Sequence, residues 1–353
     1  MSIGMFPVIY FHRKDAILTS LALDKIMVSL GYLSNSQKNK DIHETMEFEG
    51  QIFVDCGIFQ KGFYKHFVNE RKVVEYLFKI IEWYRHLKPD IASALDIPSQ
   101  KCANKKVKVS RLKWSIKNYK VMREVIDTPL YLGVSVFSLD EIKLAHKLIN
   151  NIVGDTPEYI ALGGLVPLMR QFEKNIKLGK IILRTIFEFH KVFPNSYLHV
   201  YGLGDHIWYP LIRLVGATSS DYASYVLISA KGKVILPGTF PKYISNITRI
   251  KKDNKLVYYR RPKDQTFSKE EIKLLNSCQC PVCKKFSVKE LESNLEYRLI
   301  HNLFVILEES RIVDKFCSED NREGLLNHMK ERFKNQRKIL SLIDYAQKLI
   351  KRR

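Results

Sequence analysis

Short apolar runs alternate with longer helical segments up to about residue 240 of this sequence. The runs are rich in β-branched and aromatic residues, as buried strands are, and they cover Pro7–Phe11, Gln51–Phe59, Ile91–Ile97, Leu130–Val136, Tyr159–Gly164, Tyr197–Gly202 and Tyr222–Ser229. Apolar residues at helical spacing lie between them, in Arg71–Leu87, Lys108–Ile126, Leu139–Asn150 and Pro167–Phe193, the last long enough for more than one helix. Strands that alternate with helices predict parallel pairing and an α/β fold.

The number of these units predicts the architecture. Roughly seven or eight strand–helix units suit a closed (β/α)8 barrel, so we predict a TIM barrel over residues 1–245, with a doubly wound open sheet as the alternative. No GxGxxG or GxxxxGK[ST] loop follows any run, which argues against a dinucleotide or nucleoside triphosphate site.

After residue 245 the composition changes. We expect a zinc-binding subdomain over residues 246–310 and a basic helical tail over residues 311–353 that packs on the barrel.

The net charge of +21 is large for an enzyme of 353 residues. It favours a polyanionic partner, most often nucleic acid, although the lysines could serve solubility alone. Three segments could follow phosphates: Lys101–Lys120, Arg249–Lys263 and the tail from Lys330. Within them we single out Lys105, Lys106, Arg260 and Arg261, the last two preceded by tyrosines that could stack on bases. A solvated charged surface is the alternative for each segment.

Two further features concern location. No apolar run reaches the ~18 residues that cross a bilayer, and the N-terminal residues lack the features of a signal peptide. Three of the six cysteines crowd together, which is unlike a disulfide framework. We therefore expect a cytoplasmic protein that does not bind membranes.

The crowded cysteines predict a metal site. Cys278, Cys280 and Cys283 form a C-x-C-x-x-C motif, in which thiolates can converge on one cation. Zn²⁺ takes four ligands in a tetrahedron, and His301 is the expected fourth ligand, with Cys317 as the competitor. A closed set of four protein ligands predicts a structural zinc ion; free or buried thiols are the alternative.

Three aspartates lie at or near the ends of expected strands. They are Asp55, Asp96 and Asp221, and in a barrel these ends open onto the active-site face. Carboxylates there can act as a nucleophile, as an acid or base, or as acceptors for the edge of a base; a turn or a helix cap is the alternative for each one. Two glycine pairs, Gly163–Gly164 and Gly202 with Gly204, would let a ligand approach the backbone closely.

Five segments, in this order, resemble motifs of the tRNA-guanine transglycosylase superfamily. VDCGIFQ resembles its D-S-G-G-F-Q loop, SALDIP its second aspartate segment, ALGGL its base-binding Gly-Gly-Leu, GATSSDYASY its nucleophile segment, and CQCPVC with a later HN its zinc site. The resemblance implies a zinc-containing (β/α)8 glycosyltransferase that exchanges a guanine in nucleic acid for a 7-deazaguanine base.

The resemblance also implies roles for single residues. Asp221 would attack C1′ of the target nucleotide, and Asp55 would move protons to the departing base and from the incoming one. Two displacements at one carbon retain its configuration. The base would be bound by Asp96, Phe59, Gln60, Gly164 and Leu165.

Departures from the family pattern suggest a branch. Cys56 replaces a serine, Ile58 replaces a glycine, and Val136 falls where a base-reading glutamine is usual. The pattern most resembles the DNA-modifying branch, which inserts 7-cyano-7-deazaguanine, so DNA is the expected substrate. The alternatives are a tRNA enzyme of the same chemistry and a non-catalytic, zinc-containing nucleic-acid-binding subunit. A homodimer or a partner protein of a modification system stays open.

Overall fold

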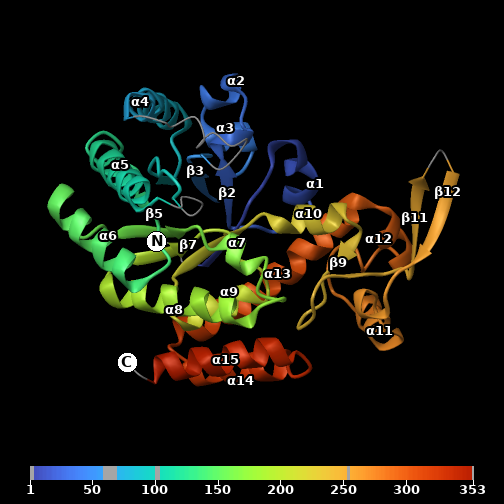
Figure 1. Ribbon diagram of the computed structural model, residues 1–353. Helices are drawn as coiled ribbons and strands as arrows, with labels where there is room; N and C mark the ends of the chain where they lie inside the picture. Colours follow the sequence, from blue (N-terminus) through green and yellow to red (C-terminus); the bar gives the residue numbers. More distant parts are fainter. Residues whose placement is uncertain (1–3, 59–69, 100–103, 253–254, 352–353) are drawn as a thin grey trace.

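Eight parallel strands form the body of the molecule. The computed structural model describes residues 4–58, 70–99, 104–252 and 255–351, with the backbone alone for residues 247–259. The strand order is β1-β8-β7-β6-β5-β4-β3-β2, with bounds β1 Gly4–Pro7, β2 Lys25–Ser29, β3 Gln51–Asp55, β4 Ile91–Ser93, β5 Leu130–Ser135, β6 Tyr159–Gly163, β7 Tyr197–Val200 and β8 Ser219–Tyr222. The sheet closes between its end strands, where the Ile9 N–H donates to the Met27 carbonyl over 2.9 Å. The fold is therefore the predicted (β/α)8 barrel rather than an open sheet (Figure 1).

Helices surround the barrel (Figure 1). They are α1 Lys14–Leu18, α2 Asn35–Lys38, α3 Ile42–Met46, α4 Glu70–Leu87, α5 Lys105–Arg123, α6 Leu139–Ile152, α7 Val166–Met169, α8 Ile176–Val192, α9 Trp208–Leu214 and α10 Ser224–Ala230, and short 3₁₀ helices occupy Phe11–Arg13, Leu30–Tyr32 and Lys263–Gln265. In α6, Ser138 caps the first turn, and the apolar positions Ile142, Ala145 and Ile149 are fully buried at helical spacing. Helices α4, α5, α6 and the pair α7–α8 confirm the helical segments predicted from the sequence.

Three strands differ from the prediction. Strand β2 was not predicted, the expected run Pro7–Phe11 overlaps β1 only at Pro7, and the expected strand Tyr222–Ser229 forms α10 after β8 ends at Tyr222. The sequence of β8 is SSDY, which is polar because two of its residues, Ser219 and Asp221, contact a histidine of β7. Because β8 is polar and the helix after it is apolar, the sequence pattern places the strand too late in the chain.

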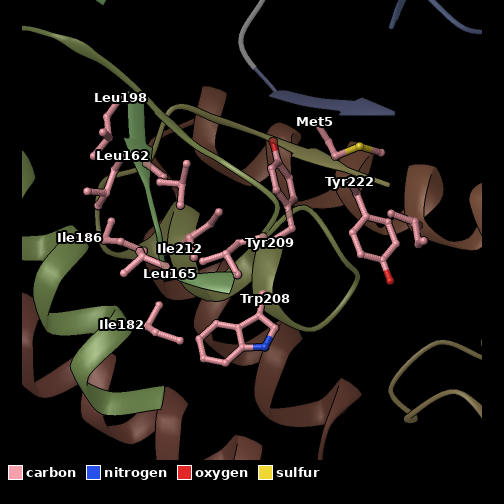
Figure 2. Packing of buried hydrophobic residues seen from close by; sticks show 14 of the residues in the cluster. Met5, Leu162, Leu165, Ile182, Ile186, Leu198, Trp208, Tyr209, Ile212 and Tyr222 are labelled. Carbon is pink, nitrogen blue, oxygen red and sulfur yellow. The ribbon is translucent and has the colours of Figure 1, made fainter. Parts of the chain in front are cut away.

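The apolar packing has two parts. Outside the sheet, Ile182 and Ile186 of α8 pack near Leu162 of β6 and Leu198 of β7 (Figure 2). Inside the barrel, alternate strand residues form a separate buried cluster of Phe6, Val8, Met27, Phe53, Ile91, Tyr131 and Ala161. Because side chains alternate between faces with a period of two, the residues two positions after Met27, Phe53 and Ile91 also face the interior. Those residues are Ser29, Asp55 and Ser93. They are polar, and they lie at the C-terminal ends of their strands.

The C-terminal third adds elements beside and below the barrel (Figure 1). These are β9 Lys233–Val234, β10 Lys242–Tyr243, the hairpin β11 Ile247–Lys252 with β12 Lys255–Arg260, and the helices α11 Lys269–Asn276, α12 Val288–Ser293, α13 Leu295–Ser318, α14 Arg322–Arg332 and α15 Arg337–Ile350. Helix α13 packs against β1 and α1, and it runs through residue 310, where the sequence analysis divided the chain. Helices α14 and α15 pack against α9, and α15 also packs against α8. None of the helices in the described part of the chain is long and apolar enough to cross a membrane.

Candidate active site and metal centre

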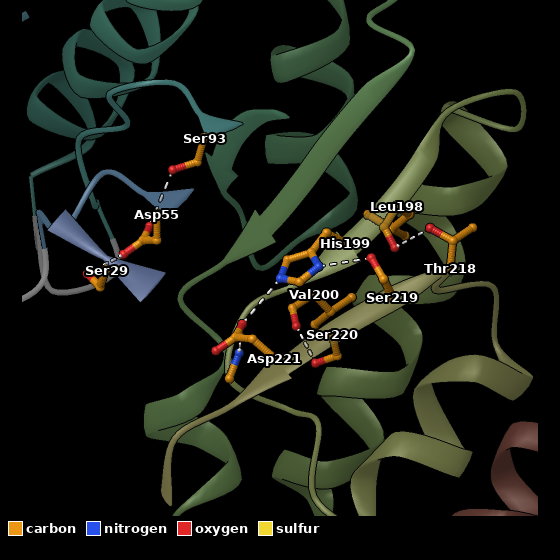
Figure 3. Close-up of polar contacts among 11 residues, drawn as sticks. Ser29, Asp55, Ser93, Leu198, His199, Val200, Thr218, Ser219, Ser220 and Asp221 are labelled. Carbon is orange, nitrogen blue, oxygen red and sulfur yellow. Dashed lines mark hydrogen bonds and ion pairs between the residues drawn. The ribbon is translucent and has the colours of Figure 1, made fainter. Parts of the chain in front are cut away.

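Asp55 ends β3 on the interior side of the barrel. Its Oδ2 accepts hydrogen bonds from the Ser29 hydroxyl over 3.0 Å and from the Gly57 N–H over 3.1 Å. Its Oδ1 accepts one from the Ser93 hydroxyl over 3.3 Å (Figure 3). Burial raises the pKa of Asp55, these hydrogen bonds lower it, and the negative charge of Asp221 raises it again. A carboxyl group with a raised pKa can carry a proton at a pH where an exposed aspartate has lost it.

Asp96 follows β4 and is 5% exposed. Its Oδ1 accepts a hydrogen bond from the Cys56 thiol over 3.3 Å, and the Cys56 N–H donates to the Ser93 hydroxyl over 2.9 Å. Burial, and then the negative charge of Asp55, raise the pKa of Asp96 to about 7. Two neighbouring carboxyl groups with raised pKa values are typical of a functional site.

Asp221 lies in β8, and both described hydrogen bonds of its carboxylate reach the same oxygen. Its Oδ1 accepts the Gly202 N–H over 2.8 Å and lies 3.2 Å from Nε2 of His199 (Figure 3). Gly202 has a φ of 73°, which favours glycine. A Cβ atom at Gly204 would lie 2.8 Å from the Asp221 carbonyl oxygen. Both glycines therefore lie against Asp221, and the approach of a ligand that was predicted at them stays a prediction.

The three aspartates share one electrostatic environment. Asp221 raises the pKa of Asp55, and Asp55 raises the pKa of Asp96. Tyr201 directly follows β7, and burial is the largest cause of its raised pKa. The negative charges of Asp55 and Asp96 raise this pKa further. The structure thus brings together the three carboxylates that the sequence predicted from separate strand ends.

Sequence reasoning missed four residues at the same end of the barrel: Gly133, Ser135, His199 and Tyr201. Gly133 and Ser135 occupy alternate positions of β5, His199 lies in β7, and Tyr201 directly follows that strand. The Ser135 hydroxyl is buried and has no hydrogen-bond partner among the described residues. The period of two in LYLGVS and YLHVY was the available signal, because it places these residues on the same face as the interior aromatics.

The remaining base-binding predictions fall into two groups. Gly164 directly follows β6 with a φ of 87°, and Leu165 after it is fully buried. Phe59 and Gln60 lie outside the described residues. Val136, expected where the family glutamine lies, is buried in the apolar packing outside the sheet. The interior position nearest to it in sequence belongs to Ser135.

Four residues form a possible metal centre. One ligand atom from each of Cys278, Cys280, Cys283 and His301 lies within 4.8 Å of the others. Nδ1 of His301 is 3.6, 3.5 and 3.3 Å from the three sulfur atoms, in chain order. Nε2 of His301 lies 2.9 Å from the Ile235 carbonyl oxygen. This contact orients the ring so that Nδ1 is left for a metal, as second-shell partners of ligating histidines do.

The donor set fits zinc. Three thiolates and one imidazole are a usual structural Zn²⁺ set, and all four described donors are protein groups. Cys317, the alternative fourth ligand, lies instead beside Arg213 and Asp314, whose charges affect its pKa. His301 is therefore the better fourth ligand.

The predicted nucleic-acid-binding residues have different surroundings. Lys105 and Lys106 are exposed in the first turn of α5, and Arg260 is exposed at the end of β12. The guanidinium group of Arg261 stacks on Tyr243, 3.8 Å from the ring centroid, and donates to the Ser245 carbonyl oxygen. Arg261 is thus engaged within the protein, whereas the other three side chains are free to reach solvent.

Known proteins resemble this chain over most of its length. Residues 26–336 match the family model described as queuine tRNA-ribosyltransferase. A protein of Methanocaldococcus jannaschii named tRNA-guanine(15) transglycosylase is 25% identical over 327 residues, which cover 86% of this chain and 44% of that protein. Proteins of the same name from Pyrococcus furiosus and Methanosarcina barkeri are 27% and 24% identical and cover 79% and 85% of this chain, and 42% and 54% of their own lengths. The chain spans about half the length of the curated relatives it matches. It belongs to the queuine tRNA-ribosyltransferase family.

Proposed function

We propose that this chain exchanges a guanine base in tRNA by two displacements at C1′ of the target nucleotide, with Asp221 as the nucleophile. The observation that carries the proposal is the hydrogen bonding of Asp221. Its Oδ1 is held by Gly202 and His199, at the barrel end where Asp55 and Asp96 also lie. A carboxylate fixed through one oxygen can present the other to an electrophilic carbon.

Asp55 supplies the proton in the first displacement. As Asp221 forms a bond to C1′, the bond from C1′ to the guanine nitrogen breaks, and the raised pKa of Asp55 supports proton donation to that base. In the second displacement Asp55 takes a proton from the incoming base, which attacks C1′ and releases Asp221 as a carboxylate. The two steps together retain the configuration at C1′.

Asp96 recognises the base in this proposal. A carboxylate can accept two hydrogen bonds from the N–H groups at the edge of a guanine. Gly164 and Leu165 would offer backbone groups, while Phe59 and Gln60 would complete the base site. Because Asp96 is buried and its pKa is raised to about 7, binding a base at this carboxylate would favour its ionised form.

Zinc has a structural role in the proposal. Cys278, Cys280, Cys283 and His301 would hold the ion and connect the segment after α11 to α13. No position remains for a substrate if all four bind, so the ion would stabilise the fold rather than take part in the exchange.

The relatives favour tRNA over the DNA substrate that we expected from the sequence. The relatives described above carry tRNA in their names. The charge of +21 and the exposed Lys105, Lys106 and Arg260 fit either nucleic acid, because both have a phosphate backbone. The target nucleotide must leave its stack to reach Asp221.

Guanine exchange tests the proposal directly. The purified chain is incubated with radiolabelled guanine and either a tRNA transcript or duplex DNA, with Asp221→Asn as the control. The proposal is supported if label enters tRNA with the wild-type chain and does not enter it with Asp221→Asn. Label that enters only DNA would move the chain to the DNA-modifying branch, and label in neither substrate would favour a non-catalytic binding protein.

A further inference from the structure

His199 is a fully buried polar residue beneath the aspartates. Its ring centroid lies 6.2, 5.2 and 5.7 Å from those of Phe6, Phe53 and Tyr131, with the rings edge to face. Nδ1 lies 2.9 Å from the Ser219 hydroxyl and Nε2 lies 3.2 Å from Oδ1 of Asp221 (Figure 3). The imidazole is thus fixed at both nitrogens and enclosed by aromatic rings.

The hydrogen-bond partners determine how this ring acts. An ionised carboxylate can only accept hydrogen bonds, so Nε2 carries the hydrogen that points to Asp221. In a neutral imidazole Nδ1 then accepts, and the Ser219 hydroxyl donates to it. Ser219 and Asp221 lie two positions apart on β8, so one strand fixes the ring and also supplies the carboxylate that the ring contacts.

Both donors to the Asp221 carboxylate reach Oδ1, and none of the hydrogen bonds found among the described residues reaches Oδ2. We infer that Oδ2 of Asp221 is the atom that bonds to C1′ and that His199 is a positioning residue which makes Asp221 a better leaving group. The inference rests on the function proposed above. It assigns His199 mainly to the breakdown of the covalent intermediate rather than to its formation.

The charge on Oδ1 changes between the two steps. While Oδ2 is bonded to C1′, Asp221 is a neutral ester and Oδ1 is its carbonyl oxygen. When the incoming base attacks C1′, the bond from C1′ to Oδ2 breaks, and its electron pair returns to the carboxylate, which spreads over both oxygens. Hydrogen bonds to a charged acceptor are stronger than those to a neutral one, so the N–H groups of His199 and Gly202 favour the departure of Asp221.

The test follows the covalent adduct in single-turnover experiments. A tRNA transcript is incubated with enzyme until adduct accumulates on a denaturing gel, and excess guanine is then added to start its breakdown. His199→Phe keeps an aromatic ring but removes the donor, and His199→Gln places an amide N–H at about the position of Nε2. Ser219→Ala keeps the imidazole and removes the hydroxyl that contacts Nδ1 and also hydrogen-bonds Tyr131.

The difference between a hydrogen bond to a charged acceptor and one to a neutral acceptor corresponds to a factor on the order of 10 in rate. We expect His199→Phe to slow adduct breakdown by about that factor and to change adduct formation much less, so that more adduct accumulates than in the wild type. His199→Gln should recover part of the breakdown rate, and Ser219→Ala should lie between the wild type and His199→Phe. Thermal unfolding of each variant verifies that it is folded.

Two results would overturn the inference. One is a folded His199→Phe variant that breaks down its adduct at the wild-type rate. The other is equal slowing of formation and breakdown, or loss of the adduct, in both His199→Phe and His199→Gln, which would show a general structural role. A wild-type chain that forms no adduct with nucleic acid would instead contradict the proposed function, so the two failures are distinguishable.

Discussion

Gly133 of β5 leaves room for Asp96. A Cβ atom built on Gly133 would lie 2.8 Å from the Cβ atom of Asp96 and 3.0 Å from its carboxyl carbon. Real Cβ atoms essentially never approach another atom so closely, so any other residue at position 133 must displace Asp96. The position of the proposed base-binding carboxylate therefore requires a residue without a side chain at position 133 of the neighbouring strand.

Gly133→Ala should weaken base binding. The added methyl group moves Asp96, and we expect the KM for guanine to rise tenfold or more, with a loss of about 1–3 kcal/mol in the free energy of unfolding from overpacking. Steady-state exchange and urea unfolding measure the two effects. In an Asp96→Ala background the same substitution should cost little further activity, because the two residues are in contact. Equal losses in both backgrounds would show that Gly133 acts independently of Asp96.

Asp96 should make the stability of the free protein depend on pH. Its pKa is about 7 in the fold against an ordinary value of 3.8, so between these values the folded state retains a proton that the unfolded chain has released. The free energy of unfolding therefore falls as the pH rises from about 4 to 7. Asp96→Asn should reduce this slope by up to ~1.4 kcal/mol per pH unit. Urea unfolding at several pH values measures it, and parallel curves for both proteins would contradict the shift.

Zinc content should distinguish two half-buried cysteines. Cys283→Ser removes a predicted ligand, so we expect loss of bound zinc and a clear fall in Tm, because a structural zinc ion contributes directly to folding. Cys317→Ser is the matched control and should keep one zinc ion per chain. Elemental analysis and thermal unfolding provide the readouts. If Cys283→Ser binds zinc fully and Cys317→Ser loses its zinc, then Cys317 rather than Cys283 is the ligand.

The exposed lysines at the start of α5 should contact phosphates. Replacing Lys105 and Lys106 by alanine should weaken tRNA binding and make the dependence of log K on log salt shallower, by about one unit per lost contact. Lys120→Ala, in the last turn of the same helix, is the control, because that turn lies at the opposite end of α5. Binding titrations at several salt concentrations measure the slopes. Unchanged slopes in the double variant would indicate that this end of α5 does not contact the nucleic acid.

The sequence predicted most of the barrel because apolar strands and amphipathic helices have different periods. It failed where burial and polarity conflict. In β8, Ser219 and Asp221 face other polar groups inside the fold, so the strand carries no apolar signal. Strand β2, with the sequence KIMVS, carries a buried apolar run at Ile26–Val28 and was nevertheless not predicted.

Part of the site was predictable for the same reason. Aspartates after strands meet at one end of any parallel barrel, so Asp55 and Asp96 could be grouped without coordinates. Asp221 precedes the strand that was expected at Tyr222–Ser229, and only the resemblance of GATSSDYASY to the nucleophile segment joined it to the other two. The roles of Gly133 and His199 depend on which strands are neighbours. Only the pairing of β4 with β5 and of β7 with β8 brings these residues to Asp96 and Asp221.

The most direct test of the account is a search for the covalent intermediate. The chain is incubated with a tRNA transcript, quenched in denaturant and digested, and the nucleotide-linked peptide is identified by mass spectrometry. We predict a ribose adduct on the peptide that contains Asp221, which Asp221→Asn abolishes while its tRNA binding persists. An adduct on another residue, or guanine exchange that continues in Asp221→Asn, would contradict the central claim.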